Sequence, residues 1–179
     1  MPLYAAFLRG MNVGGRRLTN DDLRAHFAAM GFAEVATFRA SGNVVFAGDE
    51  QPADAVRERI EAGLAQSLGY AVPTFVRTAA EVQAVAAATP FAPERLQGSA
   101  GKLQVGFLAE PAAPRARSDA LALAGETDGL VFDGRELYWL PAGGVLDSAL
   151  DMTSLARLLG AMTIRTKGTI ELIAAKHLA

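Results

Sequence analysis

The chain contains no cysteine among its 179 residues. This absence excludes disulfides, thiolate metal sites and cysteine nucleophiles. The chain also has no excess of basic residues, because its net charge is -2 and its isoelectric point is about 5.7. A protein whose main work is to grip nucleic acid usually carries a strong basic excess. Any anion-binding site in this chain must therefore be local.

Long apolar runs are absent as well. No stretch reaches the roughly eighteen uninterrupted apolar residues that a membrane span needs, and the N-terminus lacks the features of a signal peptide. We therefore expect a cytoplasmic protein with no membrane partner. Hydrophobic residues nevertheless make up 51% of the chain and charged residues 20%, which is enough apolar material for one large domain or two small ones.

The first half of the sequence predicts the element order β-α-β-β-α-β. Strands are expected over residues 3–8, 35–39, 43–46 and 72–77. Thr19 and Asp22 predict the capped start of the first helix, and a second helix is expected between Pro52 and Gly69. This order is that of the split β-α-β, or ferredoxin-like, unit.

The second half predicts the same order. Strands are expected over residues 102–108, 130–132, 136–140 and 162–165, with helices that end near residues 124, 159 and 177. The predicted fold class is therefore α+β, with two tandem ferredoxin-like units. The first unit spans residues 1–88 and ends in a connecting helix. Residues 89–101, which hold two prolines, two glycines and a serine, are the expected linker, and residues 102–179 form the second unit.

A glycine-rich loop with three arginines follows the first predicted strand. Its sequence is Leu8-Arg9-Gly10-Met11-Asn12-Val13-Gly14-Gly15-Arg16-Arg17. Glycines let backbone N–H groups approach a ligand, and arginines supply forked donors. The spacing is close to that of a phosphate-binding loop, but arginines stand where that loop needs lysine and then serine or threonine. A nucleoside triphosphatase is rejected, and the loop alone favours an ordinary connection with solvated arginines.

Two further stretches carry polar groups. Ser41, Gly42 and Asn43 join two predicted strands, where Ser41 and Asn43 could contact a ligand or simply form a hairpin turn. Arg165 and Lys167 precede the last predicted helix, a position that suits an anion or only a helix cap. Each stretch alone favours the structural interpretation. The two histidines have no serine or acid at a triad spacing, and no metal site or cofactor is expected.

The two N-terminal motifs, residues 8–15 followed by basic residues and Ala40-Ser41-Gly42-Asn43-Val44-Val45-Phe46, resemble a known family. They are similar to the uncharacterised bacterial family called domain of unknown function 1697. The resemblance implies tandem ferredoxin-like units and no activity that can be carried over. It marks as functional the motif residues Arg9, Gly10, Asn12, Gly14, Gly15, Ser41, Gly42 and Asn43, and so favours a functional first loop.

The C-terminal half departs from the family pattern. Members usually carry Thr-Thr-Arg-Asn-Trp near the end, where this chain has Thr163-Ile164-Arg165-Thr166-Lys167. If this segment completes the site, the ligand differs or part of the activity is lost. We also expect the first and third strands to run parallel, which would separate Arg9 and Asn43 by roughly 15–20 Å.

Three functional hypotheses remain. The leading one is a small phosphate- or carboxylate-bearing ligand held by Arg9, Asn12, Arg16 and the Gly14-Gly15 backbone, with Arg165 joining from the other half. The second is nucleic-acid binding on an open sheet face with aromatic residues on the first and third strands. The third is a non-catalytic interaction or dimerisation module. No residue set indicates catalysis, so an enzyme would depend on arginine electrostatics or on Ser41.

Overall fold

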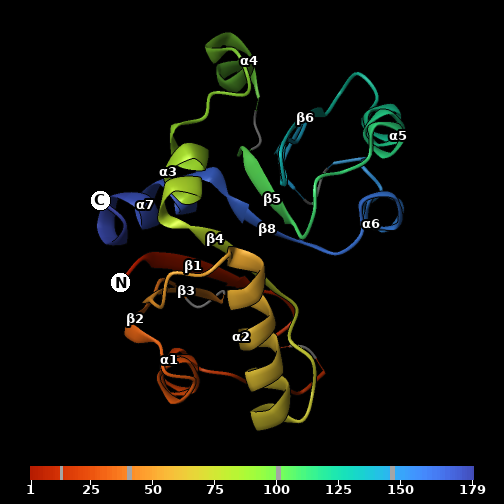
Figure 1. Ribbon diagram of the computed structural model, residues 1–179. Coiled ribbons are helices and arrows are strands. Elements are labelled where there is room, and N and C mark those ends of the chain that lie inside the picture. The colour runs from red at the N-terminus through yellow and green to blue at the C-terminus, as the bar shows by residue number, and fades with distance from the viewer. Residues whose placement is uncertain (13, 40–41, 100–101, 146–147) are drawn as a thin grey trace. The chain divides into compact units, whose positions relative to one another are not determined.

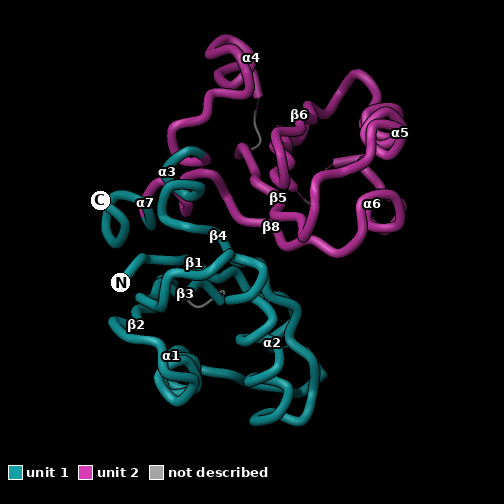
Figure 2. Tube along the Cα trace, in the orientation of Figure 1, with its two compact units in different colours: residues 1–84, 173–179 teal, residues 85–172 magenta. Residues whose placement is uncertain are grey.

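The computed structural model describes residues 1–12, 14–39, 42–99, 102–145 and 148–179. These residues form two compact units (Figure 2). Unit 1 contains Met1–Ala84 and Ile173–Ala179, and unit 2 contains Val85–Leu172. The boundary falls within helix α3 (Ala79–Ala87) and again within helix α7 (Lys167–His177). None of the helices in the described ranges is long and apolar enough to cross a membrane.

Unit 1 is a four-stranded antiparallel sheet with the strand order β2-β3-β1-β4 (Figure 1). Its elements before α3 are β1 (Leu3–Leu8), α1 (Asn20–Ala29), β2 (Ala33–Thr37), β3 (Asn43–Ala47), α2 (Ala53–Leu68) and β4 (Thr74–Thr78). This is the ferredoxin-like order that the sequence predicts. The second strand was predicted over residues 35–39 and is observed at Ala33–Thr37. It is irregular there, because Glu34 has a positive φ and the β2–β3 register shifts between Ala33 and Ala36.

The predicted parallel arrangement of the first and third strands is wrong. β1 and β3 are antiparallel neighbours, and Phe7 pairs with Asn43. The reason lies in the topology: β2 and β3 form an antiparallel pair, while the crossover through α1 makes β1 parallel to β2. The end of β1 and the start of β3 therefore lie at the same end of the sheet, and the predicted separation of Arg9 from Asn43 does not hold.

Helices α1 and α2 cover one face of the unit 1 sheet. Leu23 and Phe27 of α1 are fully buried, as is Ile60 of α2. They pack against alternate residues of the strands, such as Tyr4 and Phe46, whose rings stack with centroids 5.7 Å apart. Every second residue of these strands and the apolar face of each helix therefore contribute to a single core.

Unit 2 repeats this architecture with the strand order β6-β7-β5-β8. Its elements are α4 (Pro93–Gly98), β5 (Gln104–Leu108), α5 (Pro114–Ala124), β6 (Gly129–Asp133), β7 (Glu136–Leu140), α6 (Met152–Leu159) and β8 (Met162–Thr166). Helices α5 and α6 pack on one face of the sheet through Ala120, Leu155 and their neighbours. The chain is therefore an α+β protein with two tandem ferredoxin-like units. Helix α4 was not predicted and lies within the expected linker, residues 89–101.

Candidate functional site

The two N-terminal motifs meet at one end of unit 1. The backbone N–H of Leu8 donates to the carbonyl oxygen of Gly42 over 2.9 Å. A Cβ atom on Gly42 would lie only 3.0 Å from the Sδ of Met11 and 3.2 Å from the carbonyl oxygen of Leu8. The glycine-rich loop thus packs directly on the turn that precedes β3, and both belong to one surface.

Buried anchors and one side-chain hydrogen bond hold the loop in place. Met11 and Leu18 are buried in the core of unit 1. Between them, Oδ1 of Asn12 accepts a hydrogen bond from the backbone N–H of Leu18 over 2.8 Å. Gly14 and Gly15 have φ values of +67° and +80°, which side-chain-bearing residues rarely adopt. The glycines are therefore needed for the path that brings the arginines round to α1.

A pocket of about 500 Å³ opens beside this loop. Its lining consists of the second half of the loop and the first residues of α1: Asn12, Gly15, Arg16, Arg17, Leu18, Thr19 and Asn20. Three predicted site residues, Asn12, Gly15 and Arg16, are therefore brought together. Asn20 also connects the pocket to the residue just before the second motif, since its side chain donates to the carbonyl oxygen of Arg39 over 3.1 Å.

The arginines of the loop are not neutralised by acids. Within the described ranges, Arg9, Arg16 and Arg17 have no carboxylate oxygen within 4.0 Å. Arg24, one turn into α1, does form an ion pair with Asp21. The guanidinium of Arg16 instead lies over the ring of Tyr70, 4.0 Å from its centroid. Positive charge is consequently concentrated at the pocket, and the Arg16 guanidinium is oriented by the aromatic ring of Tyr70.

The N-terminus of α1 is already occupied by its own cap. Thr19 and Asp22 form a reciprocal capping box, as the sequence predicts. Hydrogen bonds from the backbone N–H and hydroxyl of Thr19 lower the pKa of the Asp22 carboxyl from its usual value. The negative side chain of Asp22 offsets the positive end of the helix dipole, so the loop arginines are the main source of positive charge for an anion in the pocket.

The other predicted site residues lie elsewhere or serve the fold. Asn43 is buried, and its side chain donates to the carbonyl oxygen of Phe38 over 3.0 Å, which closes the turn. Ser41 lies outside the described residues. Arg165 belongs to β8 of unit 2, where it donates to the hydroxyl of Thr163 over 2.6 Å. Burial lowers the pKa of Arg165 to about 10.

The sheet of unit 1 offers no exposed aromatic platform on the residues that the nucleic-acid hypothesis needs. Tyr4, Phe7 and Phe46 have exposed fractions of 2%, 0% and 0%. Stacking of bases requires rings that are accessible on the sheet surface. In the part of the chain that the structure describes, no group of three or more histidines and acids could hold a metal ion.

Sequence comparison extends the motif-level resemblance. Residues 1–138 match the family described as "Protein of unknown function (DUF1697)". The chain belongs to the DUF1697 family. The match ends before β8, so the divergent segment from Thr163 to Lys167 lies outside the part that identifies the chain as a DUF1697 member. Among curated proteins, no sequence matches this DUF1697 chain.

A solved structure is similar to this DUF1697 protein over nearly its whole length. It is described as the structure of conserved bacterial protein SP0830 from Streptococcus pneumoniae. The TM-score is 0.72 and the sequence identity is 21%, with 98% of this chain and 97% of the other covered. At this identity the similarity supports the tandem fold of the DUF1697 chain and carries nothing about a ligand.

Two residues of this surface were not identified by sequence reasoning. Tyr70 follows the end of α2, where no motif marks it, and only the folded chain brings its ring under Arg16. Arg39 has a φ of +59°, and its carbonyl oxygen receives the Asn20 side chain. A left-handed arginine is uncommon, and nothing in the local sequence signals it.

Proposed function

We propose that unit 1 binds a small phosphate- or carboxylate-bearing ligand in the pocket beside the Arg9–Gly15 loop. The observation that carries the proposal is the pocket of about 500 Å³ lined by Asn12, Arg16 and Arg17. The guanidinium groups there have no carboxylate partner among the described residues. Arg9 is exposed at the start of the loop and is not among the residues that line the pocket.

The chemistry of these residues suits an oxyanion. A guanidinium presents paired N–H donors that match carboxylate and phosphate oxygens, and such charge-assisted bonds are about twice as strong as neutral ones. Tyr70 restricts Arg16, so less side-chain entropy is lost when a ligand binds. Asn12 uses Oδ1 to hold Leu18, and no hydrogen bond of the described chain occupies its Nδ2.

Thermal unfolding tests the proposal. The wild type is screened against inorganic phosphate, pyrophosphate, citrate and nucleoside monophosphates at constant ionic strength. A ligand at 100 times its Kd adds about 2.7 kcal/mol, which raises Tm by roughly 5–10 °C for a chain of this size. Arg17→Ala should abolish most of the shift. Arg115→Ala removes a highly exposed arginine of unit 2 and should leave the shift unchanged.

Asn12→Asp separates binding from folding. The carboxylate still accepts the hydrogen bond from the N–H of Leu18, so Tm without ligand should stay close to that of the wild type. The new negative charge lies in the pocket and should weaken anion binding by about tenfold or more. Equal affinity of wild type and Asn12→Asp for every anion would contradict the proposed site.

A further inference from the structure

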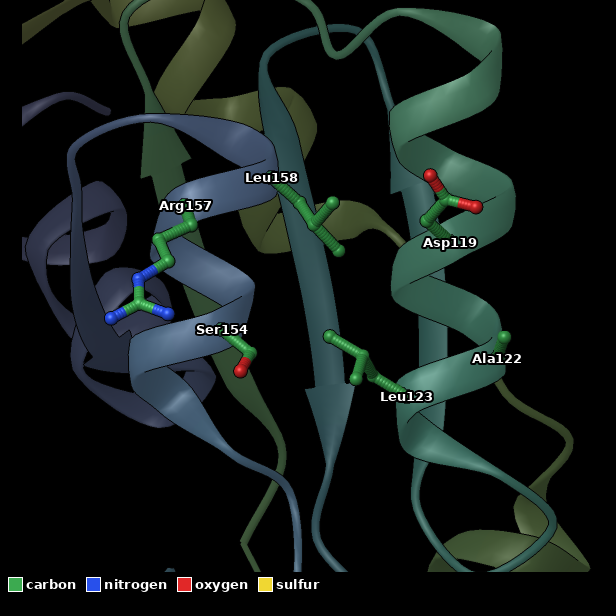
Figure 3. Close-up of a pocket in the computed structure, with 6 residues that line it drawn as sticks. All are labelled: Asp119, Ala122, Leu123, Ser154, Arg157 and Leu158. Carbon is green, nitrogen blue, oxygen red and sulfur yellow. The ribbon is translucent and has the colours of Figure 1, made fainter.

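Unit 2 exposes apolar side chains on its helix pair. Leu121 and Leu123 of α5 have exposed fractions of 47% and 40%, and Ala122 between them is exposed too. Beside them lies a groove of about 480 Å³ between α5 and α6. Figure 3 shows Leu123 and Leu158 extending from the two helices into the space between them. The remaining lining residues are Asp119, Ala122, Ser154 and Arg157.

The corresponding helices of unit 1 have a different outer surface. Arg57 of α2 forms ion pairs with Asp54, Glu58 and Glu61, and Arg24 of α1 pairs with Asp21. In α5, by contrast, the five residues that follow Asp119 are all alanine or leucine. The second half of α5 is thus apolar, whereas ion pairs run along α1 and α2 of unit 1. Exposed apolar patches rimmed by polar residues mark interaction sites.

We propose that a second copy of this chain covers the α5–α6 groove in a symmetric dimer. A two-fold interface must be self-complementary, because each copy presents the same surface to the other. The groove meets this requirement: its α5 wall carries Asp119 and its α6 wall carries Arg157. A two-fold axis along the groove sets α5 against α6 of the second copy. Each Asp119 then faces Arg157 of the second copy, and the leucines pack at the centre.

Both charges are available for this pairing. Asp119 is 3.9 Å from the guanidinium of Arg115, whose side chain is 94% exposed, so that contact is weak and easily replaced. Within the described ranges, Arg157 has no carboxylate oxygen within 4.0 Å. Packing of Leu123 and Leu158 supplies the apolar centre of the interface, while the flanking ion pairs fix its register.

Charge reversal provides the test, with oligomeric state measured by sedimentation velocity from about 1 μM to about 1 mM, the range of weak protein association. The wild type is expected to dimerise within this range. Asp119→Arg and Arg157→Asp should each be monomeric, because each places like charges opposite one another. An equimolar mixture of the two variants should dimerise again, since every pair across the mixed interface is then attractive. Glu110→Arg makes the same charge change outside the groove and should dimerise like the wild type.

Three results would overturn the proposal. The first is a wild type that stays monomeric over the whole range, which would leave the groove to a partner of another kind. The second is a dimer that neither reversal weakens, which would place the interface elsewhere. The third is failure of the mixture to associate although both variants unfold at the wild-type Tm.

Discussion

At the scale of single residues, glycines set the path of the candidate site, but they do so for different reasons. Gly14 and Gly42 both have positive φ values, of +67° and +75°. A Cβ on Gly14 would meet no atom within 4 Å, whereas one on Gly42 would crowd Met11 and the backbone of Leu8. Gly14 is therefore constrained by backbone conformation alone, and Gly42 by conformation and close packing together.

Alanine substitutions should separate these two roles. Gly14→Ala should cost roughly 1–2 kcal/mol, the strain of a left-handed alanine. Gly42→Ala should cost about 3 kcal/mol or more, because the carbonyl oxygen of Leu8 belongs to a strand and cannot move aside. Chemical denaturation of both variants measures the difference, and equal losses would show that packing between loop and turn adds nothing.

At the scale of elements, local sequence patterns predicted helix caps and strand bounds. The Thr19–Asp22 capping pattern was confirmed as a hydrogen-bonded cap, and β1 and β7 have their predicted bounds. What failed was a relation between elements, the direction of β3 against β1. The stacking of Arg16 on Tyr70 could not be predicted from the sequence either, since only tertiary folding brings these two residues together.

The cap of α1 gives a prediction for pH. Because hydrogen bonds from Thr19 hold the pKa of Asp22 below its usual value in the folded state, its contribution to stability is fully present above the usual pKa of an aspartate. The contribution is lost as pH falls through the lowered pKa. The stability difference between wild type and Asp22→Ala should therefore be largest near neutral pH and vanish in strong acid. Thermal unfolding across this range checks it, and a constant difference would contradict the cap.

In unit 2, a buried carboxylate links β7 to the chain that follows it. Asp128 is 4% exposed. It accepts hydrogen bonds from the Trp139 indole over 2.8 Å, the Ala142 N–H over 3.0 Å and the Ser148 hydroxyl. Trp139 lies in the strand predicted over residues 136–140, but nothing in the local sequence connects it with Asp128.

Asp128→Ala should destabilise the protein by roughly 2–4 kcal/mol, since it leaves several buried donors unsatisfied. Ser148→Ala removes a half-buried hydroxyl and should cost clearly less. Urea denaturation followed by tryptophan fluorescence measures both effects at the affected ring. Similar losses for the two variants would contradict a network centred on the carboxylate.

At the scale of the whole molecule, the end of the chain returns to unit 1 after unit 2 is complete. Residues 173–179 belong to unit 1, with Ile173 and Leu178 buried and the Leu178 carbonyl oxygen bonded to the Gln83 side chain. Repetition of an element order in sequence predicts two consecutive units. It does not predict that residues 173–179 pack on unit 1, because the apolar pattern of α7 does not indicate which unit buries it.

Deletion of residues 173–179 should therefore destabilise the protein by about 3–6 kcal/mol, the burial of two large aliphatic side chains. Lys176→Ala changes an exposed position of the same segment and should have little effect. Hydrogen exchange should show the loss of protection in β1 and β3. Unchanged protection in these strands after deletion would show that the segment does not stabilise unit 1.

The proposed anion site lies on the glycine-rich loop of unit 1. The most direct measurement is a nuclear magnetic resonance titration of the ¹⁵N-labelled protein with inorganic phosphate at constant ionic strength. We expect saturable shifts of the Gly14 and Gly15 amides and of the Arg16 and Arg17 Nε–Hε signals. Loop signals that stay unchanged to the end of the titration, whether or not other amides shift, would contradict it.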